Sequence, residues 1–286
     1  PLPFPNPEPL TTTTVIPKHG LKLLVMLTTL CLETHDIPPP EKHSTVTPIP
    51  KKSGILTSVD EIRPIAVGPV FGRMVNKLIA SRLGAAITKS STSISPILDP
   101  AAFAFLPGKS IHEPINSIAS CFRQSLSSPN NSPNKACYAI FYDISKAYDT
   151  LPWSSIERAL RRLHFPSPFI SLVMNMLTGT HIRFKTPDPN WTTSPIQMHK
   201  AVKQGCPLAP LLFCIVLDEL HCKYRTLGGY SLTTGPRVSS RGYCDDTAII
   251  SNNLKDLSTM NDWTAEFMAC HNLTLNTTKT HITGRH

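Results

Sequence analysis

The sequence lacks the patterns of a zinc protein and of a membrane protein. Its eight cysteines include no Cys-x-x-Cys pair and none stands with a histidine at zinc-ligand spacing, which argues against a structural zinc site and indicates reduced, mostly buried thiols. The longest apolar stretch, 21–32, is interrupted by Lys22 and by threonines, and is too short to span a bilayer. No signal peptide is recognisable, so we expect an intracellular protein, nuclear or cytoplasmic, without membrane contact.

Acidic residues are scarce relative to basic ones. The chain of 286 residues has 19 Asp and Glu against 28 Lys and Arg, which gives a formal net charge of +9 and a pI near 9.2. Such an excess of positive charge attracts phosphate backbones. A basic soluble protein that binds no nucleic acid can have the same net charge, so charge alone does not decide between them. Hydrophobic residues make up 41%, which is enough for a sizeable core.

The order of predicted elements indicates an α+β fold. Residues 1–9 alternate with proline and predict an extended lead-in. Residues 45–50 predict an edge strand, because prolines are tolerated where no ladder bond is needed. A capping box of Ser154 and Glu157 is expected to open a helix. The other expected elements are helices over 20–31, 70–83, 207–220 and 254–269, a helix opened by Ser167-Pro168, strands over 62–67 and 137–141, a hairpin of 182–185 with 196–202, and a hairpin around 245–246.

Three aspartates are placed as a phosphoryl-transfer site requires. Asp143 ends one apolar run, and Asp245 and Asp246 lie between two others. An acidic pair alone is usually an ordinary turn. Here Tyr243 and Cys244 precede the pair and an apolar run follows it, so the carboxylates lie at the edge of a buried sheet, where a charge is costly unless it is paired or metal-bound. Carboxylates are hard ligands suited to Mg²⁺, and two strand ends can hold a metal pair.

Five short segments stand in order between residues 44 and 280. They are Ile49-Pro50-Lys51-Lys52 with Arg63-Pro64-Ile65, Phe105-Leu106-Pro107-Gly108-Lys109-Ser110, Phe141-Tyr142-Asp143-Ile144-Ser145-Lys146-Ala147-Tyr148-Asp149, Gln204-Gly205-Cys206-Pro207-Leu208-Ala209-Pro210, and Tyr243-Cys244-Asp245-Asp246. Each is weak alone, and their ordered co-occurrence is specific. With these segments the chain resembles the reverse transcriptases, most closely those of non-LTR (LINE-type) retrotransposons. Cys244 departs from the family, in which Ala, Val or Met is commoner.

This resemblance implies the fingers and palm of a right-hand polymerase, with an antiparallel palm sheet backed by helices. We expect residues 1–43 to form a Pro-rich lead-in and a short helix that precedes or begins the fingers. Residues 44–286 would form the fingers and palm, with the sequence ending at His286 before a thumb.

The resemblance also implies the catalytic residues and the metal ligands. Asp143, the carbonyl of Ile144, Asp245 and Asp246 would hold two Mg²⁺ ions, for which Mn²⁺ can substitute. Lys279 occupies the place of a lysine proposed in the family to protonate the pyrophosphate leaving group.

The residues that would bind the incoming dNTP follow from the same resemblance. Tyr148 matches the aromatic steric gate that fills the space of a ribose 2′-hydroxyl. The turn over 145–148 would direct backbone N–H groups at the triphosphate, and basic side chains would grip it. Asp149 is predicted to cap the helix that follows. The predicted dNTP-binding residues are one of Lys51 and Lys52, with Arg63, Lys146, Ala147, Tyr148, Gln204 and Gly205.

The implied function is RNA-directed DNA polymerisation in retrotransposon replication, with an RNA template, a DNA primer, dNTPs and further domains of a longer polyprotein. An RNA-dependent RNA polymerase shares the palm and the Asp-Asp hairpin, but it needs a polar residue in place of Tyr148. A non-catalytic palm-like scaffold that binds nucleic acid would not need Asp143, Asp245 and Asp246 together.

Overall fold

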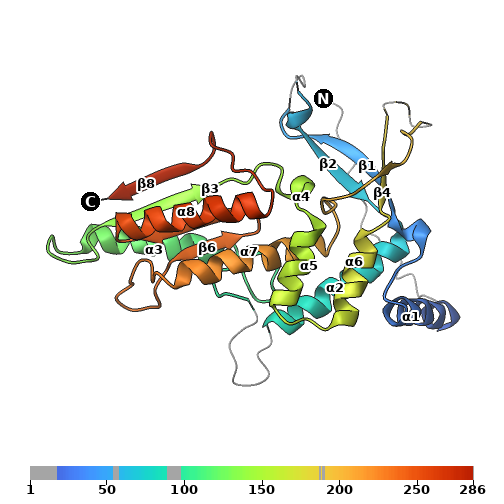
Figure 1. Cartoon of the computed structure of the whole chain (residues 1–286), viewed down its shortest axis with the longest axis horizontal. Coiled ribbons are helices and arrows are strands. Elements are labelled where there is room, and N and C mark those ends of the chain that lie inside the picture. The colour runs from blue at the N-terminus through green and yellow to red at the C-terminus, as the bar shows by residue number, and fades with distance from the viewer. Residues whose placement is uncertain (1–17, 54–57, 89–97, 187, 189–190, 286) are drawn as a thin grey trace, which may run out of the picture.

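The computed structural model describes residues 18–53, 58–88, 98–186, 188 and 191–285, so the lead-in predicted over 1–9 lies outside the described residues. Two four-stranded sheets lie toward different ends of an elongated molecule (Figure 1). We call them the palm sheet and the fingers sheet. The palm sheet consists of β6 (Ser240–Tyr243), β7 (Asp246–Ser251), β3 (Cys137–Tyr142) and β8 (His281–Arg285), in that order, and all its pairs are antiparallel.

The central strand β3 is apolar because both of its faces are covered. Tyr138, Ile140 and Tyr142 contact the main core, whereas Cys137 and Ala139 face a smaller cluster. Helices α7 (Ala209–Arg225) and α8 (Leu254–Cys270) belong to the main core, and α3 (His112–Ser127) contributes to the smaller cluster. The sheet is therefore held on both faces, which fixes the positions of its strand ends.

Helix α7 is apolar around most of its circumference, as expected of a buried helix. Phe213, Ile215 and Tyr224 are fully buried, and α5 (Trp153–Arg162) packs beside the helix. One charged side chain is enclosed with them: Asp218 is 0% exposed and pairs with Arg162 of α5. This ion pair links two helices of the main core.

The fingers sheet has the order β2 (Ile62–Val67), β1 (His43–Pro50), β4 (His181–Phe184) and β5 (Ile196–Gln197). The prediction that residues 45–50 form an edge strand was wrong, because β1 lies between β2 and β4. The parallel pairing with β4 covers only 43–46 of β1. Pro48 and Pro50 lie beyond it, on the half of β1 that needs no ladder bond on that side.

Two further local predictions were wrong. Helix α5 begins at Trp153 after Pro152, with no side-chain cap, so Ser154 and Glu157 form no capping box; Glu157 pairs with Arg161 at 2.7 Å instead. Residues 198–202 do not continue β5, because the amides of Ala201 and Val202 donate to the carbonyls of Leu151 and Tyr148. The remaining elements are α1 (Lys18–Glu33), α2 (Val70–Thr88), α4 (Ala147–Thr150), α6 (Ser167–Leu177) and the 3-10 turns Pro39–Lys42 and Val59–Glu61.

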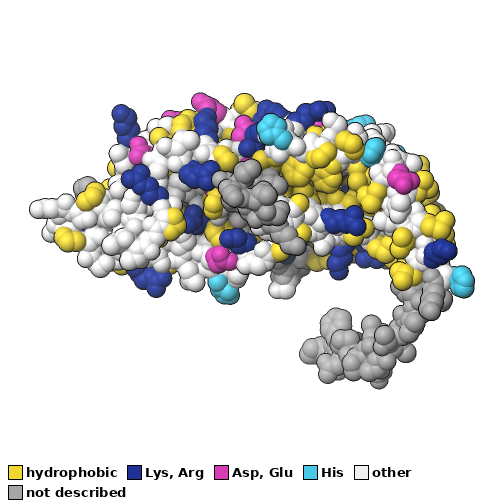
Figure 2. Space-filling view, turned by 90° about the horizontal axis from the view of Figure 1, so that it is seen from below, with side chains coloured by type: hydrophobic (Ala, Val, Ile, Leu, Met, Phe, Trp, Pro, Cys, Tyr) yellow, Lys and Arg dark blue, Asp and Glu magenta, His cyan; other side chains and the backbone are white. Residues whose placement is uncertain are grey.

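Helix α1 exposes most of its large apolar side chains, including Leu21, Val25 and Met26, and buries Cys31. Figure 2 shows hydrophobic side chains gathered toward the end of the molecule at which Figure 1 places α1. Within the described ranges, no helix has the length and apolar character that a membrane crossing requires.

Candidate active site

The strand register of the palm sheet brings the predicted metal ligands to one edge. The pairing of β3 with β7 ends at Tyr142 and Thr247. Asp143 directly follows β3, and Asp246 is the first residue of β7. Asp246 also pairs with Tyr243 to close the β6–β7 hairpin, and Asp245 lies in its turn. Two separate sequence segments therefore deliver three carboxylates to one end of a rigid sheet.

The three carboxylates repel one another. Burial raises the pKa of Asp245 above its ordinary value, and the charges of Asp246 and Asp143 raise it further. Burial also raises the pKa of Asp246, as does Asp143, while the Lys279 ammonium acts in the opposite direction. Like charges raise each other's pKa values when they share a site, so this edge of the sheet favours the binding of positive charge.

Lys279 supplies part of that positive charge. Its Nζ lies 3.7 Å from Oδ2 of Asp143. The segment before it is fastened to the strand end, because the amide of Asn276 donates to the carbonyl of Asp143 and the amide of Ser145 donates to the carbonyl of Thr274, both at 2.8 Å. Neither bond uses the carbonyl of Ile144, which the resemblance assigns to a metal. Lys279 is thus held beside Asp143, and its catalytic role stays a prediction.

The donor set fits a hard divalent cation. Carboxylate and carbonyl oxygens are the ligands that Mg²⁺ prefers, and burial, followed by the charge of the neighbouring aspartates, raises the pKa values of Asp245 and Asp246. Across the described ranges, no three His, Cys, Asp or Glu side chains are already gathered as a group that could hold a metal ion. Lys279, and not a fourth acidic residue, is the group that contacts Asp143.

The turn after Asp143 has the form expected of an anion-binding turn. Lys146 adopts a left-handed conformation with φ of 48°, and its carbonyl accepts from the amides of Asp149 and Thr150 as α4 begins. Ala147 is buried. The Tyr148 ring stacks on Phe213 with 5.7 Å between ring centroids, and its hydroxyl lies 2.7 Å from Sγ of Cys244.

The prediction that Asp149 caps the following helix was wrong, because Asp149 lies within α4. Its carboxylate accepts from Nε2 of Gln204 at 3.1 and 3.2 Å. Burial raises the pKa of Asp149, and the hydrogen bond from Gln204 and the charges of Lys146 and Lys51 counter that rise. Asp149 thus fixes the side chain of a predicted dNTP-binding residue.

Gly205 has φ of 106°, and a Cβ there would lie 2.8 Å from the carbonyl oxygen of Ala66. The neighbouring carbonyl of Gln204 accepts from the amide of Ala66 at 2.7 Å. The close approach that requires glycine is therefore to strand β2, whereas the sequence predicted an approach to substrate. This contact joins the fingers sheet to the loop before α7.

The basic residues predicted in the fingers lie at one end of the β1–β2 pair. Arg63 stands opposite Ile49 and is exposed. The amide of Lys51 donates to the carbonyl of Glu61 at 2.7 Å, and its charge acts on the pKa of Asp149. Lys51 is therefore on the side of the active site, and Lys52 is exposed next to it.

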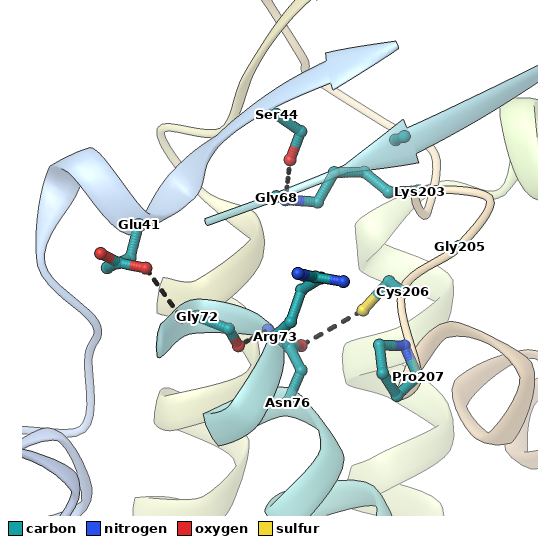
Figure 3. Close-up of a pocket in the computed structure, with 11 residues that line it drawn as sticks. Glu41, Ser44, Gly68, Gly72, Arg73, Asn76, Lys203, Gly205, Cys206 and Pro207 are labelled. Carbon is teal, nitrogen blue, oxygen red and sulfur yellow. Dashed lines mark hydrogen bonds between the residues drawn. The ribbon is translucent and has the colours of Figure 1, made fainter. Parts of the chain in front are cut away.

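A basic pocket lies beside the Gln204–Gly205 loop (Figure 3). The side chains of Arg73 and Lys203 converge on it, and Nζ of Lys203 donates to the hydroxyl of Ser44 at 3.0 Å. Burial lowers the pKa of Lys203. Among the described residues neither cation has a carboxylate within ion-pair distance, since Glu41 instead accepts from the amide of Gly72 at 2.7 Å.

Sequence reasoning missed several residues of this site. Lys203 stands directly before the Gln204-Gly205 motif, and that position was a usable signal. Arg73 lies in a helix with no motif, and Phe213 and Cys214 look like ordinary core residues of α7, so only their contacts with Tyr148 and Cys244 distinguish them.

Comparisons with known proteins agree with this geometry. The family model described as "Reverse transcriptase (RNA-dependent DNA polymerase)" matches residues 49–285. A Pol polyprotein from the type-1 retrotransposable element R2 of Popillia japonica is 28% identical over 85% of this chain and 32% of its own length. A Pol polyprotein from the type-2 element R2DM of Drosophila melanogaster is 28% identical over 78% of this chain and 20% of its own length. The chain thus spans a third or less of these relatives.

The fold is similar to that of a telomerase from Candida tropicalis solved with a fragment of telomeric RNA. The TM-score is 0.60 with 13% sequence identity, over 92% of this chain and 45% of the telomerase chain. This likeness confirms the mixed helix-and-sheet polymerase fold expected from the sequence.

Proposed function

The chain belongs to the reverse transcriptase family, and from that premise we propose that it extends a DNA primer on an RNA template in the replication of a non-LTR retrotransposon. The observation that carries the proposal is the meeting of Asp143, Asp245 and Asp246 at the ends of β3 and β7. Residues 44–286 would supply the fingers and palm of the enzyme. The relatives are polyproteins, and we propose that this chain likewise acts with other domains.

Reverse transcriptases generally use divalent metal ions, and we propose that the three aspartates hold two Mg²⁺ ions with the help of the Ile144 carbonyl. When bound, such ions activate a primer 3′-hydroxyl and stabilise the charge of the leaving pyrophosphate. The backbone N–H groups of residues 146–148, in the turn with its left-handed residue at Lys146, would bind the triphosphate. Arg63 and Lys51 add positive charge on the fingers side, with Lys52 next to them.

Lys279 has a second task in this proposal. Its ammonium contacts Asp143 at 3.7 Å, and 67% of its side chain is exposed, so it is free to turn toward a triphosphate that enters the site. A proton donated from Nζ to the departing pyrophosphate would make Lys279 a general acid.

The RNA template is proposed to contact the basic pocket of Arg73 and Lys203. Both side chains point into it, and phosphate would supply the counter-charge that no carboxylate of the described residues provides, since Glu41 in the same pocket accepts from the amide of Gly72. The net charge of +9, and a face on which Lys and Arg are spread and acidic side chains are sparse (Figure 2), favour the same partner.

An RNA-dependent RNA polymerase is the enzyme that most needs to be distinguished. Tyr148 speaks against it, because an aromatic ring beneath the sugar leaves no room for a 2′-hydroxyl. Primer extension on poly(rA) with an oligo(dT) primer, Mg²⁺ and either dTTP or UTP tests this directly. We expect dTTP incorporation to dominate, and we expect Tyr148→Ala to lower the ratio of kcat/KM values for dTTP over UTP by about tenfold or more. Equal use of both nucleotides by the unmodified protein would favour the RNA polymerase.

A further inference from the structure

Cys244 is the residue at which this chain departs from its family, and it lies in the turn that carries the catalytic aspartates. Its φ of 61° is in the left-handed region that is uncommon for residues other than glycine. The side chain is only 6% exposed. The thiol is therefore enclosed behind the active site, within the packing of the main core.

The enclosed thiol contacts Tyr148. The Tyr148 hydroxyl lies 2.7 Å from Sγ of Cys244, and within the described part of the chain no other hydrogen-bond partner of this hydroxyl is present. The face of the same ring stacks on Phe213, with an angle of 20° between the ring planes. The ring is thus fixed at two points, its face by α7 and its hydroxyl end by the catalytic turn.

A second thiol supports the first. Cys214 follows Phe213 in α7 and is 4% exposed, and its interaction with the Cys244 thiol raises the pKa of Cys214. Its Sγ also lies 3.7 Å from the carbonyl oxygen of Ala104. A continuous line of contacts therefore runs from Ala104 through Cys214 and Cys244 to the hydroxyl of Tyr148.

We propose that Cys244, supported by Cys214, is a positioning residue that holds the Tyr148 ring in place and thereby sets how strongly the site rejects ribonucleotides. This inference rests on the proposed function, in which Tyr148 is the sugar gate. A ring anchored only by stacking can slide within its plane or tilt out of it. A hydrogen bond at the hydroxyl fixes the outer edge of the ring. Loss of that bond would free space for a 2′-hydroxyl without removing a metal ligand.

The first test is a double-mutant cycle on sugar selectivity. Cys244→Ala and Tyr148→Phe each remove one side of the contact and keep the aromatic ring. Each is expected to lower the ratio of kcat/KM for dNTP over rNTP by about threefold to tenfold, the effect of one hydrogen bond. The ratio for the double variant should be no lower than that of the less selective single variant, because both changes remove the same contact. Cys244→Ser keeps a hydrogen-bonding group and should restore most of the selectivity.

Multiplicative losses in the double variant, or an unchanged ratio in Cys244→Ala, would overturn the inference. Cys121→Ala is the matched control, since Cys121 is fully buried in the smaller cluster, and it should leave the ratio unchanged. If Cys121→Ala lowers the ratio as much as Cys244→Ala does, the effect comes from a general loss of packing, and the inference again fails.

A second readout does not require polymerisation and so separates this inference from the proposed function. Alkylation of Cys244 by iodoacetamide in the folded protein, followed by peptide mass spectrometry, reports whether the Tyr148 hydroxyl is bound to the thiol. The thiolate is the species that reacts, and a hydrogen bond from Tyr148 stabilises it. Tyr148→Phe keeps the ring that covers the thiol and removes this bond, so alkylation at Cys244 should slow severalfold, while the rate at Cys121 stays the same. If the unmodified protein makes no DNA, the proposed function fails and the alkylation rates still decide: a decrease at Cys244 supports the contact, and an unchanged or faster rate rejects it.

Discussion

The two sheets present groups of opposite charge to the candidate active site and differ in how firmly they are held. The palm sheet places carboxylates at the ends of strands that are buried on both faces. In the fingers sheet, Arg63 lies on β2, and Lys51 and Lys52 directly follow β1, whose last three residues are exposed. Metal ligands need fixed positions, whereas groups that grip a mobile phosphate need reach. The difference in packing therefore matches the difference in chemistry.

The contrast extends to the interior charges. In the palm, Asp218 is fully buried, pairs with Arg162, and accepts from the amide of Asp99. Lys203, in the loop between β5 and α7, is desolvated, and among the described residues the hydroxyl of Ser44 is the one hydrogen-bond partner of its ammonium. The buried carboxylate of the palm thus has a cation beside it, whereas the buried cation beside the fingers sheet has no carboxylate among the described residues.

The largest expected effect comes from the palm carboxylates. Asp143→Asn or Asp245→Asn removes a proposed metal ligand and keeps the shape of the side chain, so we expect kcat/KM for dNTP to fall by about a thousandfold or more. Primer extension measures it, with circular dichroism to check folding. Asp262→Asn, an exposed position on α8, is the matched control and should retain activity. Synthesis by either active-site variant would remove the basis for the proposed metal site.

A second prediction concerns the buried ion pair of the palm core. Arg162→Ala leaves the buried carboxylate of Asp218 without its cationic partner, and breaking such a pair costs about 3 kcal/mol of unfolding free energy. Arg161→Ala, at the neighbouring position, breaks only the exposed pair with Glu157 and should cost about 0.5 kcal/mol. Urea unfolding compares the two. Equal losses would show that Asp218 does not depend on Arg162.

Many strands and helices of the two sheets were predictable from the sequence, and the elements that were missed have physical causes. The apolar runs around Asp143 and Asp245 predicted buried strands, because strands covered on both faces need continuous hydrophobic residues. Strand β8 was missed because all five of its residues are exposed, so it shows no alternation. Helix α3 was missed because its few buried residues include Pro114 and Ser125, which give no apolar stripe.

The site was predictable where a residue belongs to a local motif and unpredictable where its role depends on a distant contact. Asp143, Tyr148 and Lys279 stand in recognisable segments. The Cys244 thiol meets Tyr148 across 96 positions of the chain, and Asp149 meets Gln204 across 55. No pattern of spacing reports such contacts, because they depend on how the β6–β7 turn and the loop before α7 pack against α4.

A third prediction tests the fingers as a phosphate-binding region. Arg73→Gln and Lys203→Gln should each weaken RNA binding and reduce the slope of log affinity against log salt by about 0.7, the value for one phosphate contact on a single strand. Fluorescence anisotropy with a labelled RNA across a salt series measures both. Arg82→Gln is the control, because Arg82 is exposed on the same helix nine positions away, which is the opposite face. A slope that changes equally in all three variants would mean that RNA contacts no particular pocket.

The smallest expected effect is a gain in stability from Asp245→Asn, the same change that is expected to abolish activity. The pKa of Asp245 is raised in the folded protein by burial and by Asp246 and Asp143. The folded state therefore holds the proton more tightly than the unfolded state, and stability falls as the pH rises from the unfolded pKa of about 3.9 through the raised folded value. At neutral pH without metal, Asp245→Asn removes this charge and should raise the melting temperature by about 2 °C. The gain should disappear near pH 3, where Asp245 is protonated, and should reverse when Mg²⁺ is added to both proteins. Scanning calorimetry at the two pH values measures the difference. A lower melting temperature for Asp245→Asn at neutral pH without metal would mean that the carboxylate is stabilised by its surroundings, and that the palm edge is not short of positive charge.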